Sequence, residues 1–152
     1  MLPTPRRVSA RPLVTVCGSF NRHLAEIKLA VEELFDYGAV VLSPERPVSV
    51  SREFAPGFLL LDSDLRFKKL SVRAVEDRHL AAIMKSDFVV LVCPDGYLGC
   101  AVAGEMGAAR AVNVPLYAEH TPIDDKLGPY VYRVPSLQLA VANHRIHTLP
   151  TA

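Results

Sequence analysis

Short apolar runs of strand length alternate with segments of helical periodicity along most of the chain, and this alternation restricts the fold more than any other feature of the sequence. The apolar runs lie at residues 12–18, 39–44, 87–93 and 114–118, and most of them lack regular apolar–polar alternation. Strands of this kind are buried on both faces, in parallel sheets that helices cover. The pattern predicts a three-layer α/β fold with a five-stranded, mainly parallel sheet, whose last strand lies at residues 130–134.

Segments of helical periodicity connect these runs. The first predicted helix is capped by Asn21 and ends at Gly38, a residue that favours the left-handed conformation of a C-terminal cap. Further helices are expected at about residues 71–86, after Gly99, and from Pro135 onward. Helices on both faces of the sheet correspond to the Rossmann-like, flavodoxin-like form of this fold class. The stripe of the first helix that is expected to face the sheet consists of Leu24, Ile27, Val31, Leu34 and Phe35.

A length of 152 residues suits one domain. We expect this domain at residues 12–146, between tails at residues 1–11 and 147–152. Residues 45–70 have neither helical nor strand periodicity and predict a long loop, with a short element near residues 58–61. Loops of this length are usually functional or mobile.

The long loop carries three aromatic residues, Phe54, Phe58 and Phe67. Two interpretations are open, because loop aromatics either stack on a ligand or form a small core of their own.

The composition excludes several classes of protein. The formal net charge is +1 and half of the residues are apolar, which is typical of a soluble globular protein and not of one that binds nucleic acid polymers. We expect neither a membrane span nor a signal peptide, and hence a cytoplasmic protein. Cys17, Cys93 and Cys100 are odd in number and lack C-x-x-C spacing, so we predict neither disulfides nor a metal site, and no cofactor.

A ligand site is expected beyond the carboxyl ends of the parallel strands. Glycine-containing turns follow the first strand at residues 18–22 and the third at residues 94–99, and residues 117–120 follow the fourth. Backbone N–H groups in such turns, together with helix N-termini, suit a sugar or a phosphate. The alternative is that these glycines serve only the fold, since no dinucleotide or nucleoside-triphosphate fingerprint is present. The candidate substrate-binding residues are Cys17, Gly18, Ser19, Phe20, Arg22, Asp95, Gly96, Tyr97 and Gly99.

One carboxylate, Glu105, stands in a helical segment of small residues, CAVAGEMGAARAV. Small side chains allow this helix to approach the sheet and a ligand closely, which would leave Glu105 partly desolvated beside the crevice. A solvent-facing glutamate in the first half of a helix is an equally good interpretation, because negative charge is favourable there.

Two stretches, VTVCGSF and SDFVVLVCPDGYLGCAVAGEMGAARAVNVPLYAE, resemble the nucleoside 2-deoxyribosyltransferase-like superfamily, which includes the 2′-deoxynucleoside 5′-phosphate N-hydrolases. The resemblance covers roughly residues 12–134. It implies that Glu105 attacks the anomeric carbon of a nucleoside or nucleoside 5′-monophosphate. It also implies that Gly18, Ser19 and Phe20 hold the sugar or the 5′-phosphate, with Arg22 as a phosphate partner, and that the chain forms a homodimer or a larger homo-oligomer.

The sequence departs from the family at one catalytic position. The family aspartate that orients the ribose hydroxyl and the nucleophile falls on His79, eight residues before Asp87. Three interpretations are open: His79 hydrogen-bonds the sugar or Glu105, Asp77 substitutes from a neighbouring turn, or His79 is a core residue with a partner of its own.

The implied chemistry is cleavage or transfer at an N-glycosidic bond, through an oxocarbenium-like sugar that an ionised Glu105 would stabilise. Candidate proton donors for the leaving base are Asp77, His79, Asp95 and Tyr97. A non-catalytic nucleotide- or sugar-binding module is the first alternative. A lysine-decarboxylase-like phosphoribohydrolase is the second, although its P-G-G-x-G-T-x-x-E loop is only partly matched by the PDGYLG stretch.

Overall fold

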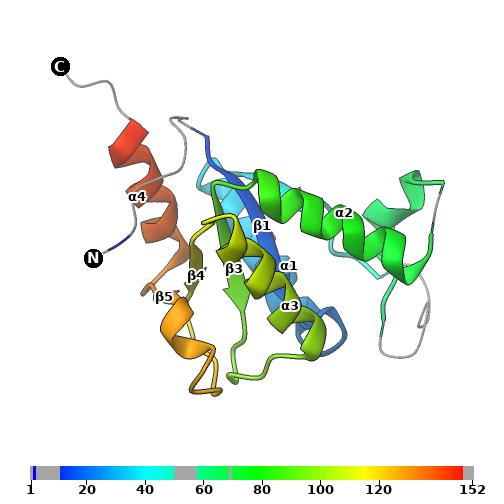
Figure 1. Cartoon of the computed structure of the whole chain (residues 1–152). Coiled ribbons are helices and arrows are strands. Elements are labelled where there is room, and N and C mark those ends of the chain that lie inside the picture. Colours follow the sequence, from blue (N-terminus) through cyan, green and yellow to red (C-terminus); the bar gives the residue numbers. More distant parts are fainter. Residues whose placement is uncertain (1, 3–10, 50–57, 69, 149–152) are drawn as a thin grey trace.

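The computed structural model describes residue 2 and residues 11–49, 58–68 and 70–148, and within them it has one five-stranded sheet (Figure 1). All strand pairs are parallel, and the strand order is β2-β1-β3-β4-β5. The predicted three-layer α/β class with a flavodoxin-like sheet is therefore confirmed, and the sheet is parallel throughout. The strands are β1 (Leu13–Gly18), β2 (Val40–Ser43), β3 (Phe88–Val92), β4 (Leu116–Ala118) and β5 (Tyr132–Arg133).

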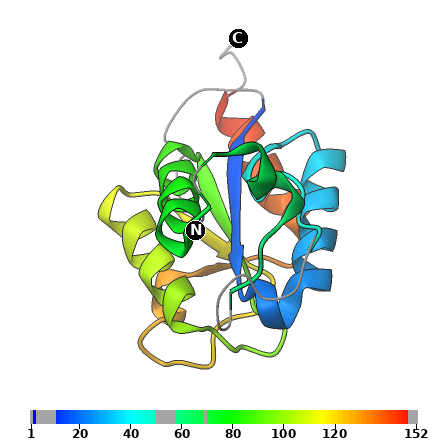
Figure 2. The same ribbon diagram turned by 90° about the vertical axis from the view of Figure 1, so that its right-hand side faces the viewer.

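Two helices cover each face of the sheet. The pair α1 (Phe20–Asp36) and α4 (Leu137–Thr148) lies on one face, and the pair α2 (Val72–Lys85) and α3 (Cys100–Ala111) lies on the other (Figure 2). Successive residues of a strand point to opposite faces, so each strand contributes to two cores. The core under α1 and α4 contains Val14, Val16 and Val90, whereas the core under α2 and α3 contains Cys17, Val89 and Leu91.

The start and the buried face of α1 differ from the sequence prediction. Ser19, not Asn21, is the N-cap, and its hydroxyl accepts the N–H of Arg22 at 3.3 Å. Phe35 was expected on the stripe that faces the sheet, but it is 71% exposed. The buried side of α1 includes His23 and Ala30, so the helix is rotated relative to the prediction and Phe35 faces solvent. Gly38 has a φ of 88°, so its predicted left-handed conformation is confirmed.

The segment after β2 is mostly irregular, as predicted. An isolated antiparallel bridge joins Ser49 to Leu61, and a 3₁₀ helix, η1 (Asp62–Arg66), follows it. Residues 50–57 and 69, with the predicted ligand-covering Phe54, lie outside the described residues, as do residues 1, 3–10 and 149–152 of the predicted tails.

The last two elements of the fold differ in length from the prediction: the fifth strand is shorter and the last helix is longer. A second 3₁₀ helix, η2 (Gly128–Tyr130), occupies the start of the expected fifth strand and leaves two residues to β5. Helix α4 continues into the expected C-terminal tail as far as Thr148. Within the described ranges, no helix is both long enough and apolar enough to cross a membrane.

Candidate functional site

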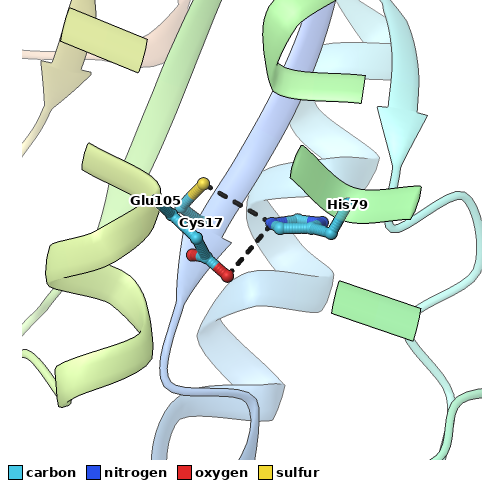
Figure 3. A group of neighbouring side chains, drawn as sticks. All are labelled: Cys17, His79 and Glu105. Atoms are coloured by element: carbon cyan, nitrogen blue, oxygen red, sulfur yellow. Dashed lines mark hydrogen bonds and ion pairs between the residues drawn. The ribbon is translucent and has the colours of Figure 1, made fainter. Parts of the chain in front are cut away.

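Three polar side chains from three separate elements meet between the sheet and the helices α2 and α3 (Figure 3). Cys17 comes from the end of β1, His79 from α2 and Glu105 from α3. His79 Nε2 lies 3.5 Å from Cys17 Sγ and 3.6 Å from Glu105 Oε1. We call these three residues the buried cluster, since the side chains of His79 and Glu105 are 7% and 3% exposed and Cys17 is buried.

The local sequence explains how the buried cluster is positioned. Cys17 faces α2 and α3 because its strand neighbour Val16 belongs to the opposite core. The residues around Glu105 are small, and α2 and α3 pack against each other, so that their side chains reach the same space. Ser43, at the end of β2, fixes the His79 ring: its hydroxyl lies 2.7 Å from Nδ1, which leaves Nε2 to face Cys17 and Glu105.

Burial controls the protonation of this cluster. Burial, followed by the negative charge of the nearby Glu76, raises the pKa of Glu105 to about 9. This shift favours the protonated form of Glu105 in the resting protein, whereas the resemblance implies an ionised Glu105 in the reaction. Burial also lowers the pKa of His79 to about 4 and raises the pKa of the Cys17 thiol well above its usual value. All three shifts favour the uncharged form of the group.

Glu76, like Ser43, is a residue of this site that the sequence analysis did not identify. It lies three positions before His79 on α2, so both side chains belong to the same side of the helix. Its carboxyl acts on both Glu105 and Cys17. The signal in the sequence is the E-x-x-H spacing in VEDRHL, which places the Glu76 carboxyl one helical turn before His79.

A cavity of about 320 Å³ adjoins the buried cluster. Glu76, His79 and Ser43 lie on its wall, and Phe20 meets the His79 ring edge-to-face with 5.8 Å between the ring centroids. The remaining wall comes largely from the segment after β2 and from α2, and it includes the two predicted aromatics that the structure describes, Phe58 and Phe67. The buried cluster therefore adjoins, through His79, a pocket whose wall is partly aromatic.

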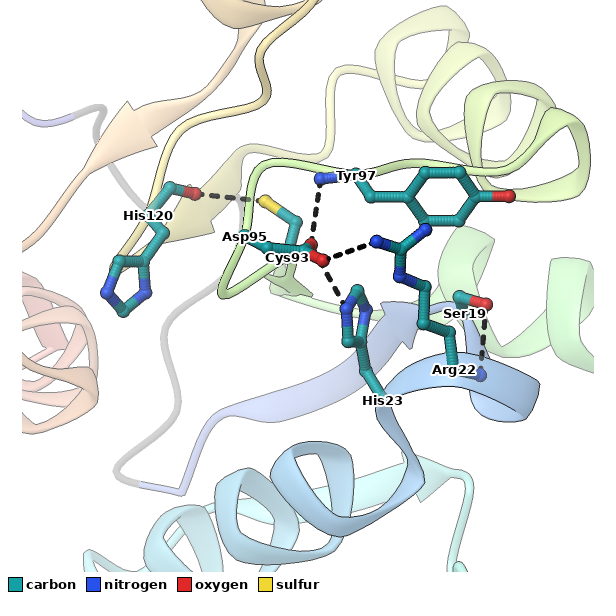
Figure 4. Close-up of polar contacts among 7 residues, drawn as sticks. All are labelled: Ser19, Arg22, His23, Cys93, Asp95, Tyr97 and His120. Carbon is teal, nitrogen blue, oxygen red and sulfur yellow. Dashed lines mark hydrogen bonds and ion pairs between the residues drawn. The ribbon is translucent and has the colours of Figure 1, made fainter.

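A second cluster of polar side chains joins the start of α1, directly after β1, to the turn after β3 (Figure 4). Asp95 accepts a hydrogen bond from Arg22 Nη2 at 2.8 Å, lies 3.1 Å from His23 Nε2 and accepts the Tyr97 N–H at 3.1 Å. The Arg22 guanidinium also lies over the Tyr97 ring, 4.2 Å from its centroid. We call these four residues the loop clasp. Arg22, predicted as a phosphate partner, is thus engaged with Asp95, and His23 was not foreseen.

Several of the predicted binding glycines have structural reasons of their own. A Cβ on Gly18 would lie 2.8 Å from the carbonyl oxygen of Val92, so the close approach of β1 to β3 requires glycine. Gly96 has a φ of 79°, which a residue with a side chain rarely adopts. Gly99 is the N-cap of α3. For Gly18 and Gly96 the geometry favours the interpretation that they serve the fold.

Asp77 is not brought to the buried cluster. Its side chain is 63% exposed and lies 3.6 Å from Arg73 Nε, one turn earlier on α2. The helix therefore turns Asp77 to solvent while Glu76 and His79 line the cavity.

The comparisons with known proteins add nothing to this geometry: no protein-family model matches the sequence, and no curated protein matches it.

Proposed function

We propose that this chain binds a nucleoside or a nucleoside 5′-monophosphate in the cavity beside the buried cluster and cleaves or transfers its N-glycosidic bond. The observation that carries the proposal is the buried carboxyl of Glu105, which interacts with a second carboxyl, that of Glu76, and Glu76 lies on the wall of the pocket. Glu105 is the group that attacks or stabilises the anomeric carbon. The resemblance of residues 12–134 to the nucleoside 2-deoxyribosyltransferase-like superfamily points in the same direction.

Two neighbouring carboxyls suit this chemistry, because an oxocarbenium-like sugar needs a carboxylate close to the anomeric carbon. The resting Glu105 holds a proton, since its pKa is raised to about 9. It must release this proton before it can stabilise positive charge or form a glycosyl ester. Two carboxyls that share a site readily hold one proton between them, and Glu76 is placed to accept it.

The pocket suits the rest of the ligand. Its volume of about 320 Å³ lies at the lower end of the range for small-molecule sites. Phe20, Phe58 and Phe67 on its wall offer apolar surface for a base. His79, held by Ser43, is a neutral hydrogen-bonding group within reach of both the pocket and Glu105.

A second candidate function is a nucleotide- or sugar-binding module without catalysis. The observation that favours it is the burial of Glu105, which is 3% exposed and protonated at rest. Such a protein would bind ligands in the same pocket and leave them intact. Ligand partners and the predicted homo-oligomer remain predictions for either function.

The deciding experiment is chromatography of free bases after incubation with ribo- and deoxyribonucleosides and their 5′-monophosphates. The wild-type protein is expected to release one base, and Glu105→Gln to lose at least about 10²-fold in rate while it still binds the ligand. Asp77→Asn, which changes an exposed carboxyl on the same helix as Glu76, is the matched control and should retain the rate. Ligand binding by the wild type without base release would favour the binding module.

A further inference from the structure

The buried cluster offers three different metal-ligand atoms to one point. Cys17 Sγ, His79 Nε2 and a carboxylate oxygen of Glu105 all lie within 4.8 Å of one another. They come from β1, α2 and α3, so the fold, and not a short motif, brings them together. The sequence prediction of no metal site depended on the missing C-x-x-C spacing, which does not bear on ligands from separate elements.

The two separations from His79 Nε2, to Cys17 Sγ and to Glu105 Oε1, correspond to tetrahedral coordination of one ion. Zinc lies about 2.3 Å from sulfur and about 2.0–2.2 Å from imidazole nitrogen or carboxylate oxygen. Tetrahedral angles then separate sulfur from nitrogen by about 3.5 Å and nitrogen from oxygen by about 3.3 Å. The structure has 3.5 Å between Cys17 Sγ and His79 Nε2 and 3.6 Å between His79 Nε2 and Glu105 Oε1. Cys17 Sγ and the Glu105 oxygen lie within 4.8 Å of each other, and an ion would bind as these two atoms come to the tetrahedral separation of about 3.6 Å.

The surroundings of the three side chains fit the same use. Ser43 holds His79 Nδ1 at 2.7 Å, the kind of outer contact that orients an imidazole ligand through its other nitrogen. Glu105 Oε2 is buried without a hydrogen bond of ordinary geometry among the described residues. His79 lies on the cavity wall, which gives an ion a route to the cluster from the pocket side.

We propose that Cys17, His79 and Glu105 bind one thiophilic divalent cation of the Zn²⁺ class, which displaces the protons of the Cys17 thiol and the Glu105 carboxyl to solvent, with the fourth coordination position left to water or a neighbouring carboxylate. The mixture of sulfur, nitrogen and oxygen donors selects zinc-like ions over Mg²⁺ or Ca²⁺, which prefer oxygen alone. This site goes beyond the proposed function and does not depend on it. If Glu105 also attacks a sugar, the ion and the sugar compete for the same carboxylate, and zinc inhibits turnover.

The test is titration of the chelator-treated, tag-free full chain with Co²⁺, followed by displacement with Zn²⁺. The wild type is expected to bind one equivalent of Co²⁺, with a thiolate-to-cobalt charge-transfer band that Zn²⁺ abolishes. Cys17→Ser should lose this band. The matched controls Cys93→Ser and Cys100→Ser should keep it, because Cys93 donates instead to the His120 carbonyl and Cys100 is exposed.

Three further variants keep the test decisive if Cys17→Ser does not fold. Glu105→Gln and His79→Gln should each weaken Zn²⁺ binding at least tenfold, and Ser43→Ala should weaken it about tenfold or more through the lost outer contact. Circular dichroism and thermal unfolding show which variants are folded. Absence of Co²⁺ binding by the wild type, a band that survives in folded Cys17→Ser, or a band lost in Cys100→Ser would overturn the proposal.

The spectrum does not require turnover, so the two proposals fail separately. Metal binding without base release would support the metal site and contradict the proposed glycosidase activity. Base release by a protein that binds no Co²⁺ would do the reverse.

Discussion

The protein contains two histidine–carboxylate pairs near the same edge of its sheet, and they behave in opposite ways. In the buried cluster, His79 Nε2 lies 3.6 Å from Glu105, and the pKa of Glu105 is raised to about 9. In the loop clasp, His23 Nε2 lies 3.1 Å from Asp95, and the pKa of Asp95 is lowered. The residue types are nearly the same, so partner identity does not decide which carboxyl is ionised.

Access to water and the neighbouring groups decide it. The Asp95 side chain is 44% exposed, and the Tyr97 N–H, His23 and Arg22 stabilise its charge. Glu105 is 3% exposed, and the neighbouring Glu76 carboxyl, whose charge has the same sign, also raises its pKa. Burial penalises the charged form, and among the residues that the structure describes no cation contributes to the pKa of Glu105. The buried pair therefore favours an uncharged carboxyl, whereas the exposed pair holds an ionised carboxylate that joins the start of α1 to the turn after β3.

Glu105→Gln should have the largest effect on stability, and the effect should depend on pH. The unfolded chain releases the Glu105 proton near its ordinary pKa of 4.5 and the folded chain near 9, so between these values the folded state binds more protons. Stability is then lost as pH rises, by up to about 1.4 kcal/mol per pH unit. His79, with its pKa lowered from 6.5 to about 4, has the opposite effect below about pH 6.5.

The variant removes this dependence, so its Tm should rise relative to that of the wild type as the pH increases from 4.5 to 9, the window set by the two pKa values of Glu105. His79 is present in both proteins, so its contribution cancels in the difference. Thermal unfolding at several pH values measures the difference. Parallel pH profiles for the two proteins would mean that Glu105 ionises normally, and the contrast between the two pairs would not hold.

Glu76→Gln should have an intermediate effect on the same profile. Removal of the Glu76 charge lowers the pKa of Glu105, so the alkaline loss of stability should end at a lower pH than in the wild type. Asp77→Asn serves as the control, because the neighbouring carboxyl faces solvent and should leave the profile unchanged. Equal shifts in both variants would indicate a general effect of net charge instead of a contact with Glu105.

Gly96→Ala tests the turn that carries Asp95. The new side chain would adopt a φ of 79° and meet the Ile123 side chain, so stability should fall by about 1–2 kcal/mol in urea unfolding. Gly107→Ala is the matched control: it lies in α3 with open space around it, and it should gain about 0.5–1 kcal/mol. A neutral Gly96→Ala would show that this turn relaxes freely.

Arg22→Ala should have the smallest effect. The Arg22 side chain is 53% exposed, and an ion pair in water contributes little and is screened by salt. We expect a slight decrease of Tm at low ionic strength that disappears at high salt. A large decrease that persists in salt would show that the loop clasp supports the fold as strongly as the buried cluster does.

Most of the fold could be predicted from local patterns. The apolar runs became β1, β2, β3 and β4, and Gly38 ended α1 as expected. The errors were the cap of α1, the exposure of Phe35 and the short β5. Each of these depends on how an element is rotated or shortened by its neighbours, which periodicity alone does not contain.

The sequence by itself determined the strands, the helices and their order, because a repeat of apolar residues is a local property that survives in any environment. It also marked Glu105 as unusual, by its isolation among small residues. Only the tertiary structure decided that Glu76 and His79 meet Glu105, that Asp77 does not, and that Glu105 rests protonated. Those outcomes depend on which side chains lose water together, and desolvation is a property of the assembled fold.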